Sequence, residues 1–367
     1  MRPALHCCLL VLILSGCEAL AATRPLGIVA PGGESTIAYD INGAGQVAAV
    51  LEDEDGHQRG VLYEKGKITE LGSLGGMYSD ARRINERGEI VGSARKADGS
   101  WSAFLFDRAG GMRVLGTLGG PSSYGMALNQ QGEAVGFADT TSGDWHAFFQ
   151  HPGAAMKDLG TLGGKISYAA GINQQGQVVG TASLATEYRH AFLYDPVLGM
   201  VDLGTLGGRS SSATAINDSG MIVGASETEE RRWHAFVYDG QKMIDLGALI
   251  GRGDSYATGI NNAGHVVGTL LIGDERLSFV WRDNKMTVHR GGKGLHLTNA
   301  INDEELVIGA TYDRRMIAAT MVSNAPPVRP RGGSEFLFMV ALVLVLASAT
   351  VIYRKRYRGI PLRNYAP

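Results

Sequence analysis

The chain has 367 residues, a formal charge of −2 and 52 glycines, about twice the usual share of ~7 %. Five basic residues and no acidic residue lie in 354–367, so residues 1–353 carry 29 of the 34 basic side chains against all 36 acidic ones. This balance excludes the basic footprint of a nucleic-acid-binding protein, and no nucleic-acid partner is expected. All three cysteines lie in the first seventeen residues, which excludes a disulfide scaffold and cysteine-based zinc sites from the rest of the chain.

Residues 1–22 predict a secretory signal peptide. A basic residue precedes an apolar stretch at 9–14, and small residues follow it. Two processing routes are open. Residues 19–21 (Ala-Leu-Ala) resemble an ordinary signal-peptidase site, whereas residues 14–17 (Leu-Ser-Gly-Cys) resemble the bacterial lipobox, in which Cys17 would become a lipidated N-terminus.

Residues 23–323 contain internal repeats of about 44 residues. The sequence Leu-Gly-Thr-Leu-Gly-Gly and its close copies recur every 43 or 44 residues, beginning at Leu71, Leu115, Leu159, Leu203 and Leu246. An asparagine, usually followed by glycine at the third and seventh places, recurs at Asn42, Asn85, Asn129, Asn173, Asn217, Asn261 and Asn302. A small, then aromatic, then apolar run begins seventeen residues after six of these asparagines, at Arg59, Ser102, His146, His190, His234 and Ser278. These three recurring markers keep the same spacing from one another along the chain, so the sequence predicts seven structural repeats.

Each repeat predicts a four-stranded sheet. One unit shows four short apolar runs separated by polar or glycine-rich turns, at 167–172, 177–182, 190–194 and 200–204. A single sheet leaves both faces uncovered, so neighbouring units must stack, and units of this length with four strands are typical of propeller blades. The predicted fold class is therefore all-β, a seven-bladed β-propeller.

The two ends of the repeat region predict how the ring closes. The last unit ends after its third strand, at 316–322, whereas residues 24–28 resemble a stray fourth strand. We expect this N-terminal strand to complete the seventh blade, because pairing the start of the chain with the end removes open sheet edges.

The repeated histidines invite a metal or acid–base interpretation. His146, His190 and His234 occupy the same place in three successive blades, so they stand apart in a closed ring and cannot meet at one ion. We expect each to form a hydrogen bond to a neighbouring turn. The acidic residues at 52–55 lack the rest of a calcium loop and predict a solvated hairpin tip. No catalytic motif, metal site or cofactor is predicted.

The loops after the double glycines are the predicted ligand-binding surface, because propellers usually bind at one face around the channel mouth. Three tyrosines there stand five residues before their asparagines. The candidate residues are Tyr124, Tyr168, Tyr256, Ser122, Ser123 and Ser212. Tyrosine combines an apolar face with a polar tip, so these residues predict a glycan or peptide surface. Packing between repeats is the alternative explanation.

The C-terminal segments predict a membrane anchor. Residues 324–335 are a Pro/Gly-rich spacer, and residues 336–353 are apolar enough for a transmembrane helix of about 27 Å. Because positively charged segments stay on the cytoplasmic side, the basic tail at 354–367 is expected in the cytoplasm and the repeats on the outer side of the membrane. The alternative, a buried core helix, needs a partner domain that the sequence does not indicate. Residues 332–334 (Gly-Gly-Ser), the helix and the tail also resemble Gly-Gly C-terminal sorting signals, which implies cleavage by a rhomboid-type protease.

The repeat motifs resemble the HAF family of bacterial extracellular repeats. The resemblance covers about residues 26–322 and rests on His-Ala-Phe at 146–148, 190–192 and 234–236, each followed by an Asp-Leu-Gly-Thr-Leu-Gly-Gly-like segment. It implies an exported, propeller-like protein, often with a C-terminal sorting segment, and it supplies no substrate and no catalytic residues. The last repeat departs from the pattern, because glutamate replaces glycine three residues after Asn302.

Together these features predict an exported, membrane-tethered, non-catalytic binding or adhesion module on the extracytoplasmic side, in the periplasm or at the cell surface, with a glycan or protein ligand. One alternative is an extracytoplasmic glycan-active hydrolase or lyase, with carboxylates from several blades held ~5 to 9 Å apart. The other is a purely structural repeat protein of the cell envelope.

Overall fold

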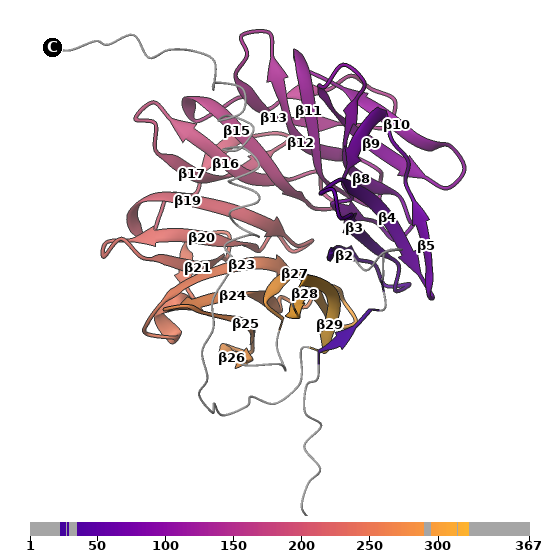
Figure 1. The fold of residues 1–367 in the computed structure, drawn as a ribbon. Coiled ribbons are helices and arrows are strands. Elements are labelled where there is room, and N and C mark those ends of the chain that lie inside the picture. The colour runs from indigo at the N-terminus through magenta and orange to yellow at the C-terminus, as the bar shows by residue number, and fades with distance from the viewer. Residues whose placement is uncertain (1–22, 27, 29–34, 290–294, 314, 323–367) are drawn as a thin grey trace, which may run out of the picture.

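The computed structural model describes residues 23–26, 28, 35–289, 295–313 and 315–322. These residues form seven antiparallel sheets that follow one another round a ring (Figure 1), which confirms the all-β, seven-bladed propeller with four-stranded blades. The predicted signal peptide, Cys17, the spacer, the transmembrane helix and the basic tail lie outside the described residues. Within the described part of the chain, no helix has the length and apolar character needed to cross a bilayer.

The first four blades follow the repeats in chain order. Blade 1 contains β2 (Ser35–Ile41), β3 (Val47–Glu52), β4 (Gln58–Glu64) and β5 (Lys67–Glu70). Blade 2 contains β6 (Gly75–Ser79) and β7 (Arg83–Ile84), which both pair with the second strand and together take the place of the first one, followed by β8 (Ile90–Lys96), β9 (Trp101–Asp107) and β10 (Gly111–Gly116). Blade 3 contains β11 (Gly119–Leu128), β12 (Ala134–Thr140), β13 (Trp145–Gln150) and β14 (Lys157–Asp158). Blade 4 contains β15 (Gly163–Ile172), β16 (Val178–Leu184), β17 (Arg189–Asp195) and β18 (Gly199–Asp202).

The last three blades keep the same order of strands. Blade 5 contains β19 (Gly207–Ile216), β20 (Ile222–Thr228), β21 (Trp233–Tyr238) and β22 (Met243–Asp245), with the 3₁₀ turn η1 (Gly247–Leu249) after it. Blade 6 contains β23 (Asp254–Ile260), β24 (Val266–Ile272), β25 (Glu275–Arg282) and β26 (Lys285–His289). Blade 7 contains β27 (Leu297–Ile301), β28 (Leu306–Asp313), β29 (Arg315–Val322) and β1 (Arg24–Pro25).

The N-terminal strand closes the ring, as the sequence predicted. Strand β1 pairs antiparallel with β29, and the backbone N–H of Leu26 extends the ladder by donating to the carbonyl of Ala318 at 3.0 Å. In Figure 1 the indigo arrow of β1 lies beside the yellow β29. The first strands of successive blades contact one another round the whole ring, including β27 against β2. The first strands therefore line a central channel.

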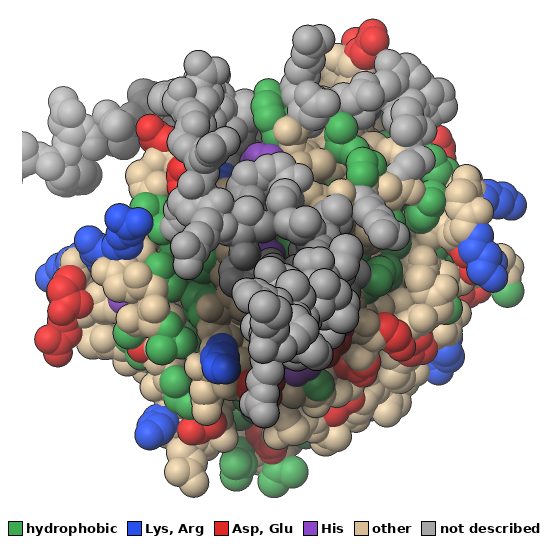
Figure 2. Space-filling view, turned by 90° about the horizontal axis from the view of Figure 1, so that it is seen from below, with side chains coloured by type: hydrophobic (Ala, Val, Ile, Leu, Met, Phe, Trp, Pro, Cys, Tyr) green, Lys and Arg blue, Asp and Glu red, His purple; other side chains and the backbone are tan. Residues whose placement is uncertain are grey.

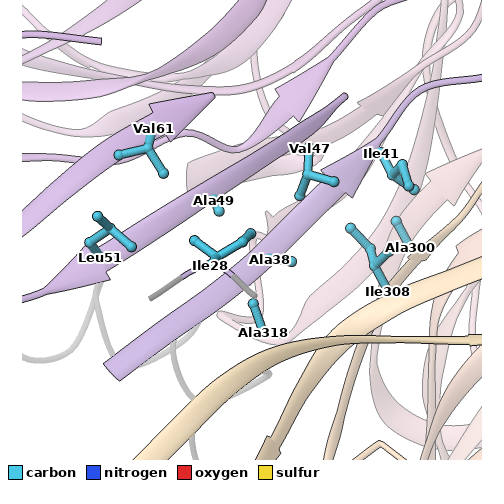
Figure 3. Packing of buried hydrophobic residues seen from close by; sticks show 10 residues of the cluster. All are labelled: Ile28, Ala38, Ile41, Val47, Ala49, Leu51, Val61, Ala300, Ile308 and Ala318. Atoms are coloured by element: carbon cyan, nitrogen blue, oxygen red, sulfur yellow. The ribbon is translucent and has the colours of Figure 1, made fainter. Parts of the chain in front are cut away.

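Among the described residues, the hydrophobic core is divided into seven clusters, one at each boundary between blades. The cluster between blades 7 and 1 contains Ile28, which is 2 % exposed and lies among side chains of both blades (Figure 3). In five blades a fully buried phenylalanine covers a glycine of the second strand, as Phe192 covers Gly180. A methyl group at Gly180 would overlap the carbonyl oxygen of Tyr168, so packing explains the glycine seven places after the asparagine.

The repeated asparagines do more than form turns. Each Nδ2 donates to the backbone carbonyl of the asparagine in the next blade over 3.0–3.4 Å, and the last bond runs from Asn302 back to Asn42. Each Oδ1 accepts the backbone N–H four residues later, as Asn173 does from Gln177 at 3.0 Å. Each asparagine therefore closes its own turn, and a circle of seven hydrogen bonds, which the sequence did not predict, joins all blades at the end of the first strands.

Candidate functional site

The two ends of the first strands define two faces of the ring, one at the double glycines and one at the asparagine turns. The sequence placed the six candidate residues in loops, and this was wrong: Ser122, Ser123 and Tyr124 lie in β11, and the others lie in the first strands of blades 4 to 6. The cause is the double glycine. Gly163 takes a φ of +97°, and a Cβ at Gly164 would clash with the second strand, so β15 already begins at the glycine pair.

Ser123 belongs to a set of hydroxyls that join successive blades. Each hydroxyl accepts a backbone N–H from the third strand of the preceding blade at 2.8–3.1 Å. The set comprises Thr36, Ser79, Ser123, Ser167, Ser211 and Ser255. The hydroxyl of Ser123 also donates to the carbonyl of Gly116 at 2.5 Å, and its side chain is fully buried. Ser123 thus contributes to packing between repeats.

The other two serines form hydrogen bonds of a different kind. The hydroxyl of Ser122 accepts the backbone N–H of Trp101 at 3.2 Å and lies half-buried. The hydroxyl of Ser212 lies 2.6 Å from that of Thr181 across the boundary between blades 4 and 5. These bonds fix the strand ends that carry the neighbouring aromatic side chains.

A continuous run of aromatic rings crosses blades 2, 3 and 4 near the double-glycine face. Successive ring centroids lie 4.7–6.5 Å apart, within the range of favourable stacked and edge-on pairs. This aromatic arc comprises Tyr78, Trp101, Tyr124, Phe137, Trp145 and Tyr168. Tyr124 is buried beneath its neighbours, and the other five rings are half-buried. The structure thus brings two of the three predicted tyrosines into one arc.

The third predicted tyrosine lies in a separate pair on the other side of the ring. Tyr256 stacks on Trp233 with centroids 6.3 Å apart, across the boundary of blades 5 and 6. Burial, followed by the charge of Asp254, raises the pKa of Tyr256 to about 12. Burial also raises the pKa of Tyr168 to about 12. Both phenols therefore stay protonated at physiological pH and present hydroxyl donors.

Two arginines flank the aromatic arc. The guanidinium of Arg95 lies 5.9 Å from the ring centre of Tyr78, and that of Arg189 lies 5.9 Å from the ring centre of Tyr168. Arginines over aromatic rings form cation–π contacts and keep N–H donors for a ligand. Over the visible part of the surface seen from below in Figure 2, acidic and basic side chains are interspersed.

The sequence missed the tryptophans of the arc. Trp101 and Trp145 begin the third strands of their blades, and Trp233 holds the same place in blade 5. This column stands one residue before the repeated histidine, so the signal was present in the sequence. Only the folded structure shows that these tryptophans lie beside the tyrosines of the next blade.

The third repeat marker was misplaced in blade 6. Gly268 pairs with Phe279 as Gly224 pairs with Phe236, so Ser278 stands at the place of alanine and Arg276 at the place of tryptophan. The hairpin between β24 and β25 is one residue shorter than its counterpart in blade 5, which a fixed count from the asparagine could not show.

The three histidines form hydrogen bonds within their own blades. His146, His190 and His234 each place Nδ1 2.8–2.9 Å from an aspartate of the fourth strand. That aspartate also accepts a backbone N–H from the glycine-rich turn, as Asp202 does from Gly204 at 2.7 Å. The histidines therefore do not bond to a turn directly, contrary to the expectation: their partners are fourth-strand aspartates, which themselves accept backbone N–H groups from the glycine-rich turn. Among the described residues, no cluster of side chains suited to a metal ion occurs.

The acidic segment at 52–55 forms the tip of the hairpin between β3 and β4, as predicted. Asp53 closes this turn by accepting the backbone N–H groups of Asp55 and His57 at 3.1 and 2.8 Å. The N–H donor of His57 and the other hydrogen bonds lower the pKa of Asp53, in line with a turn-forming role.

Comparison with solved structures supports the propeller architecture. The β-propeller domain of the Trilobed protease from Pyrococcus furiosus, for which an open velcro topology is described, is 12 % identical with a TM-score of 0.54, over 83 % of this chain and 99 % of that chain. An acylaminoacyl peptidase from Pyrococcus horikoshii is 15 % identical with a TM-score of 0.53, over 79 % of this chain and 52 % of that chain.

A puromycin-hydrolyzing peptidase from Mycobacterium tuberculosis is 12 % identical with a TM-score of 0.54, over 82 % of this chain and 54 % of that chain. The chain thus spans about half the length of these two peptidases. At such identities the likeness shows the fold alone. No family model matches the chain, and no curated protein matches it.

Proposed function

We propose that this protein is a non-catalytic binding or adhesion module whose ligand, a glycan or a protein, lies on the aromatic arc. The observation that carries the proposal is the unbroken contact of six rings across three blades, from Tyr78 to Tyr168. Tryptophan and tyrosine give large contact areas at a low cost in side-chain entropy, which makes them the usual anchors of binding surfaces.

The chemistry of the arc favours binding over catalysis. Its titratable groups are phenols, and burial holds the pKa of Tyr168 at about 12, so this hydroxyl is a poor base at neutral pH. The flanking Arg95 and Arg189 supply fixed positive charge and hydrogen-bond donors. These groups suit recognition of a sugar or peptide that offers apolar faces and acceptor oxygens.

Export and tethering belong to the same proposal. The signal peptide at 1–22 and the apolar segment at 336–353 would hold the propeller at the extracytoplasmic side of a membrane, and the resemblance to HAF repeats supports this location. Intact mass of the protein from its native cell tests the tether. A mass that retains residues 336–367 supports it, whereas a shortened C-terminus indicates a sorted and released product.

The binding test compares two tryptophans that occupy the same place in their blades. Glycan and peptide arrays first identify a ligand of the full-length chain. Trp145→Ala should then weaken binding about thirtyfold, which corresponds to about 2 kcal/mol for an aromatic anchor, and Trp233→Ala, outside the arc, should leave Kd within about twofold. Equal losses in both variants would overturn the arc as the site.

The two alternatives predict different results in this experiment. A glycan-active hydrolase or lyase would shorten the bound glycan with time, and its activity would depend on carboxylates instead of on Trp145. A purely structural envelope protein would bind nothing on the arrays, and Trp145→Ala would change only stability.

A further inference from the structure

The central channel contains a cavity of about 160 Å³. All seven blades contribute to its wall through the last three residues of their first strands, which precede the repeated asparagines. At ~30 Å³ per water molecule this volume equals about five waters. It suits a ligand of the size of one sugar ring and is smaller than the pockets that hold drug-sized molecules.

The wall of this cavity departs from the repeat in two adjacent blades. Two places before the asparagine, five blades carry alanine or glycine, where a first strand approaches its neighbour closely: a Cβ at Gly171 would lie 3.2 Å from Cα of Ala215. These residues are Ala127, Gly171, Ala215, Gly259 and Ala300. Blades 1 and 2 instead place Asp40 and Arg83 there. A small residue would satisfy the fold at this place, so the two charged side chains call for another explanation.

The polar side chains of the cavity keep unused hydrogen-bonding capacity. Arg83 uses only Nη1, which donates to the carbonyls of Tyr39 and Arg82 at 3.4 and 3.2 Å. Asn299 donates from Nδ2 to the carbonyl of Ala38 at 2.7 Å. Within the part of the chain that the structure describes, Nε and Nη2 of Arg83 and Oδ1 of Asn299 form no hydrogen bond, and Arg83 has no carboxylate within 4 Å.

Asp40 lies beside this guanidinium without pairing with it. Its Oδ2 accepts the backbone N–H of Ile84 at 2.9 Å. Burial raises the pKa of Asp40, while the charge of Arg83 opposes that rise. An anion with a single charge can therefore bind Arg83 next to Asp40, provided that it also offers a hydroxyl to the aspartate. A phosphate dianion would instead meet repulsion from the carboxylate.

We propose that the channel cavity binds a small hydroxycarboxylate of the size of a sugar acid, with its carboxylate on Arg83 and its hydroxyls on Asp40 and Asn299. Arginine prefers carboxylates because its planar fork of N–H groups matches two oxygens. Opposite the charged blades, Gly171, Ala215 and their neighbours offer a small apolar wall for the C–H face of the ligand.

This site is separate from the aromatic arc. The tyrosines of the arc stand five residues before their asparagines, whereas Asp40 and Arg83 stand two before theirs. Three residues of strand correspond to about 10 Å. The cavity site therefore does not rest on the proposed function, and either can fail without the other.

The test is calorimetric titration of the full-length chain in mild detergent with D-glucuronate, D-glucose and inorganic phosphate. We expect saturable binding of glucuronate only. Arg83→Ala should weaken it about ten- to a hundredfold, because a charge-assisted contact is lost. The control Arg113→Ala, on the exposed outer strand of the same blade, should leave Kd unchanged.

A second variant covers the event that Arg83→Ala fails to fold. Ala170→Leu adds bulk at the far wall of the cavity, because Ala170 lines the cavity and belongs to none of the hydrophobic clusters that the described residues form between blades, and it leaves Arg83 in place. It should also abolish binding, with thermal unfolding as the check on folding. Unchanged affinity in either folded variant, equal binding of glucose or phosphate, or no binding of glucuronate to the parent chain would overturn the proposal.

Discussion

Replacing Ile28 by alanine tests whether the N-terminal segment locks the ring. This side chain is 2 % exposed and fills the boundary between blades 7 and 1 (Figure 3). Its neighbours include Ala38, Ala49 and Ala318, whose short side chains cannot move into the space that it would leave. An Ile→Ala change at such a place costs about 2–5 kcal/mol. With an m value of about 3 kcal/mol/M, the urea midpoint should fall by roughly 0.7–1.7 M.

The assay is urea unfolding of the full-length chain, followed by tryptophan fluorescence. Ile244→Ala is the matched control, because Ile244 lies 37 % exposed on β22, and its loss should cost less than about 1 kcal/mol. Deleting residues 23–28 should lower the midpoint further, since it also exposes the edge of β29. Equal midpoints for Ile28→Ala and the parent chain would refute the closure argument.

Three further predictions use the same unfolding assay. Gly180→Ala should lower the free energy of unfolding by about 1–3 kcal/mol or more, because its methyl group would overlap the carbonyl of Tyr168. The control Gly110→Ala should lower it less, because its methyl group meets only the Asp107 side chain. Equal midpoints for the two variants would contradict this packing. Glu187→Gly should raise the free energy of unfolding by about 1 kcal/mol, because the exposed Glu187 has a φ of +67°, a left-handed backbone conformation that glycine adopts without strain. The control Glu229→Gly should give no such gain. A lower stability of Glu187→Gly would refute the argument from backbone strain. Because the pKa of Tyr168 is about 12 when folded and ~10 when unfolded, the unfolded chain releases this proton first, so stability is full below pH ~10 and falls between pH ~10 and ~12. Tyr168→Phe should flatten this fall, and an unchanged slope would argue against burial of the phenol.

The sequence predicted the architecture because each recurring residue of the repeat has a physical cause within its own blade. The double glycine supplies a positive φ at Gly163 and a close approach of strands at Gly164, and the asparagine caps its own turn. Such causes act within one blade, so the pattern of residues along one repeat carries them. The closing strand could also be predicted, because the last repeat has only three strands and the N-terminal segment supplies an extra one.

Contacts between blades were harder to predict. The asparagine circle joins residues of successive repeats, such as Asn173 and Asn217, and the aromatic arc joins residues 23 or 31 places apart across blade boundaries. Both sets of contacts depend on how far each blade is rotated from the next. The offset in blade 6 has the same origin, since one missing residue in a hairpin shifts Ser278 by one place. The recurring residues of each repeat were enough to predict the fold, whereas the candidate site depends on how the blades are arranged in space.

Equivalent blades offer an internal standard for separating structural from functional residues. A residue that recurs at one place round the ring, such as the asparagine or the buried phenylalanine, is explained by the contacts that every blade makes. A residue that interrupts such a column needs a cause outside the repeat. Asp40 and Arg83 interrupt the small residues at the asparagine end of the channel, and the arc is confined to blades 2 to 4 at the other end. Because the two departures lie at opposite ends of the first strands, Trp145→Ala and Arg83→Ala should affect different ligands, and a common effect would show that one of the two assignments is wrong.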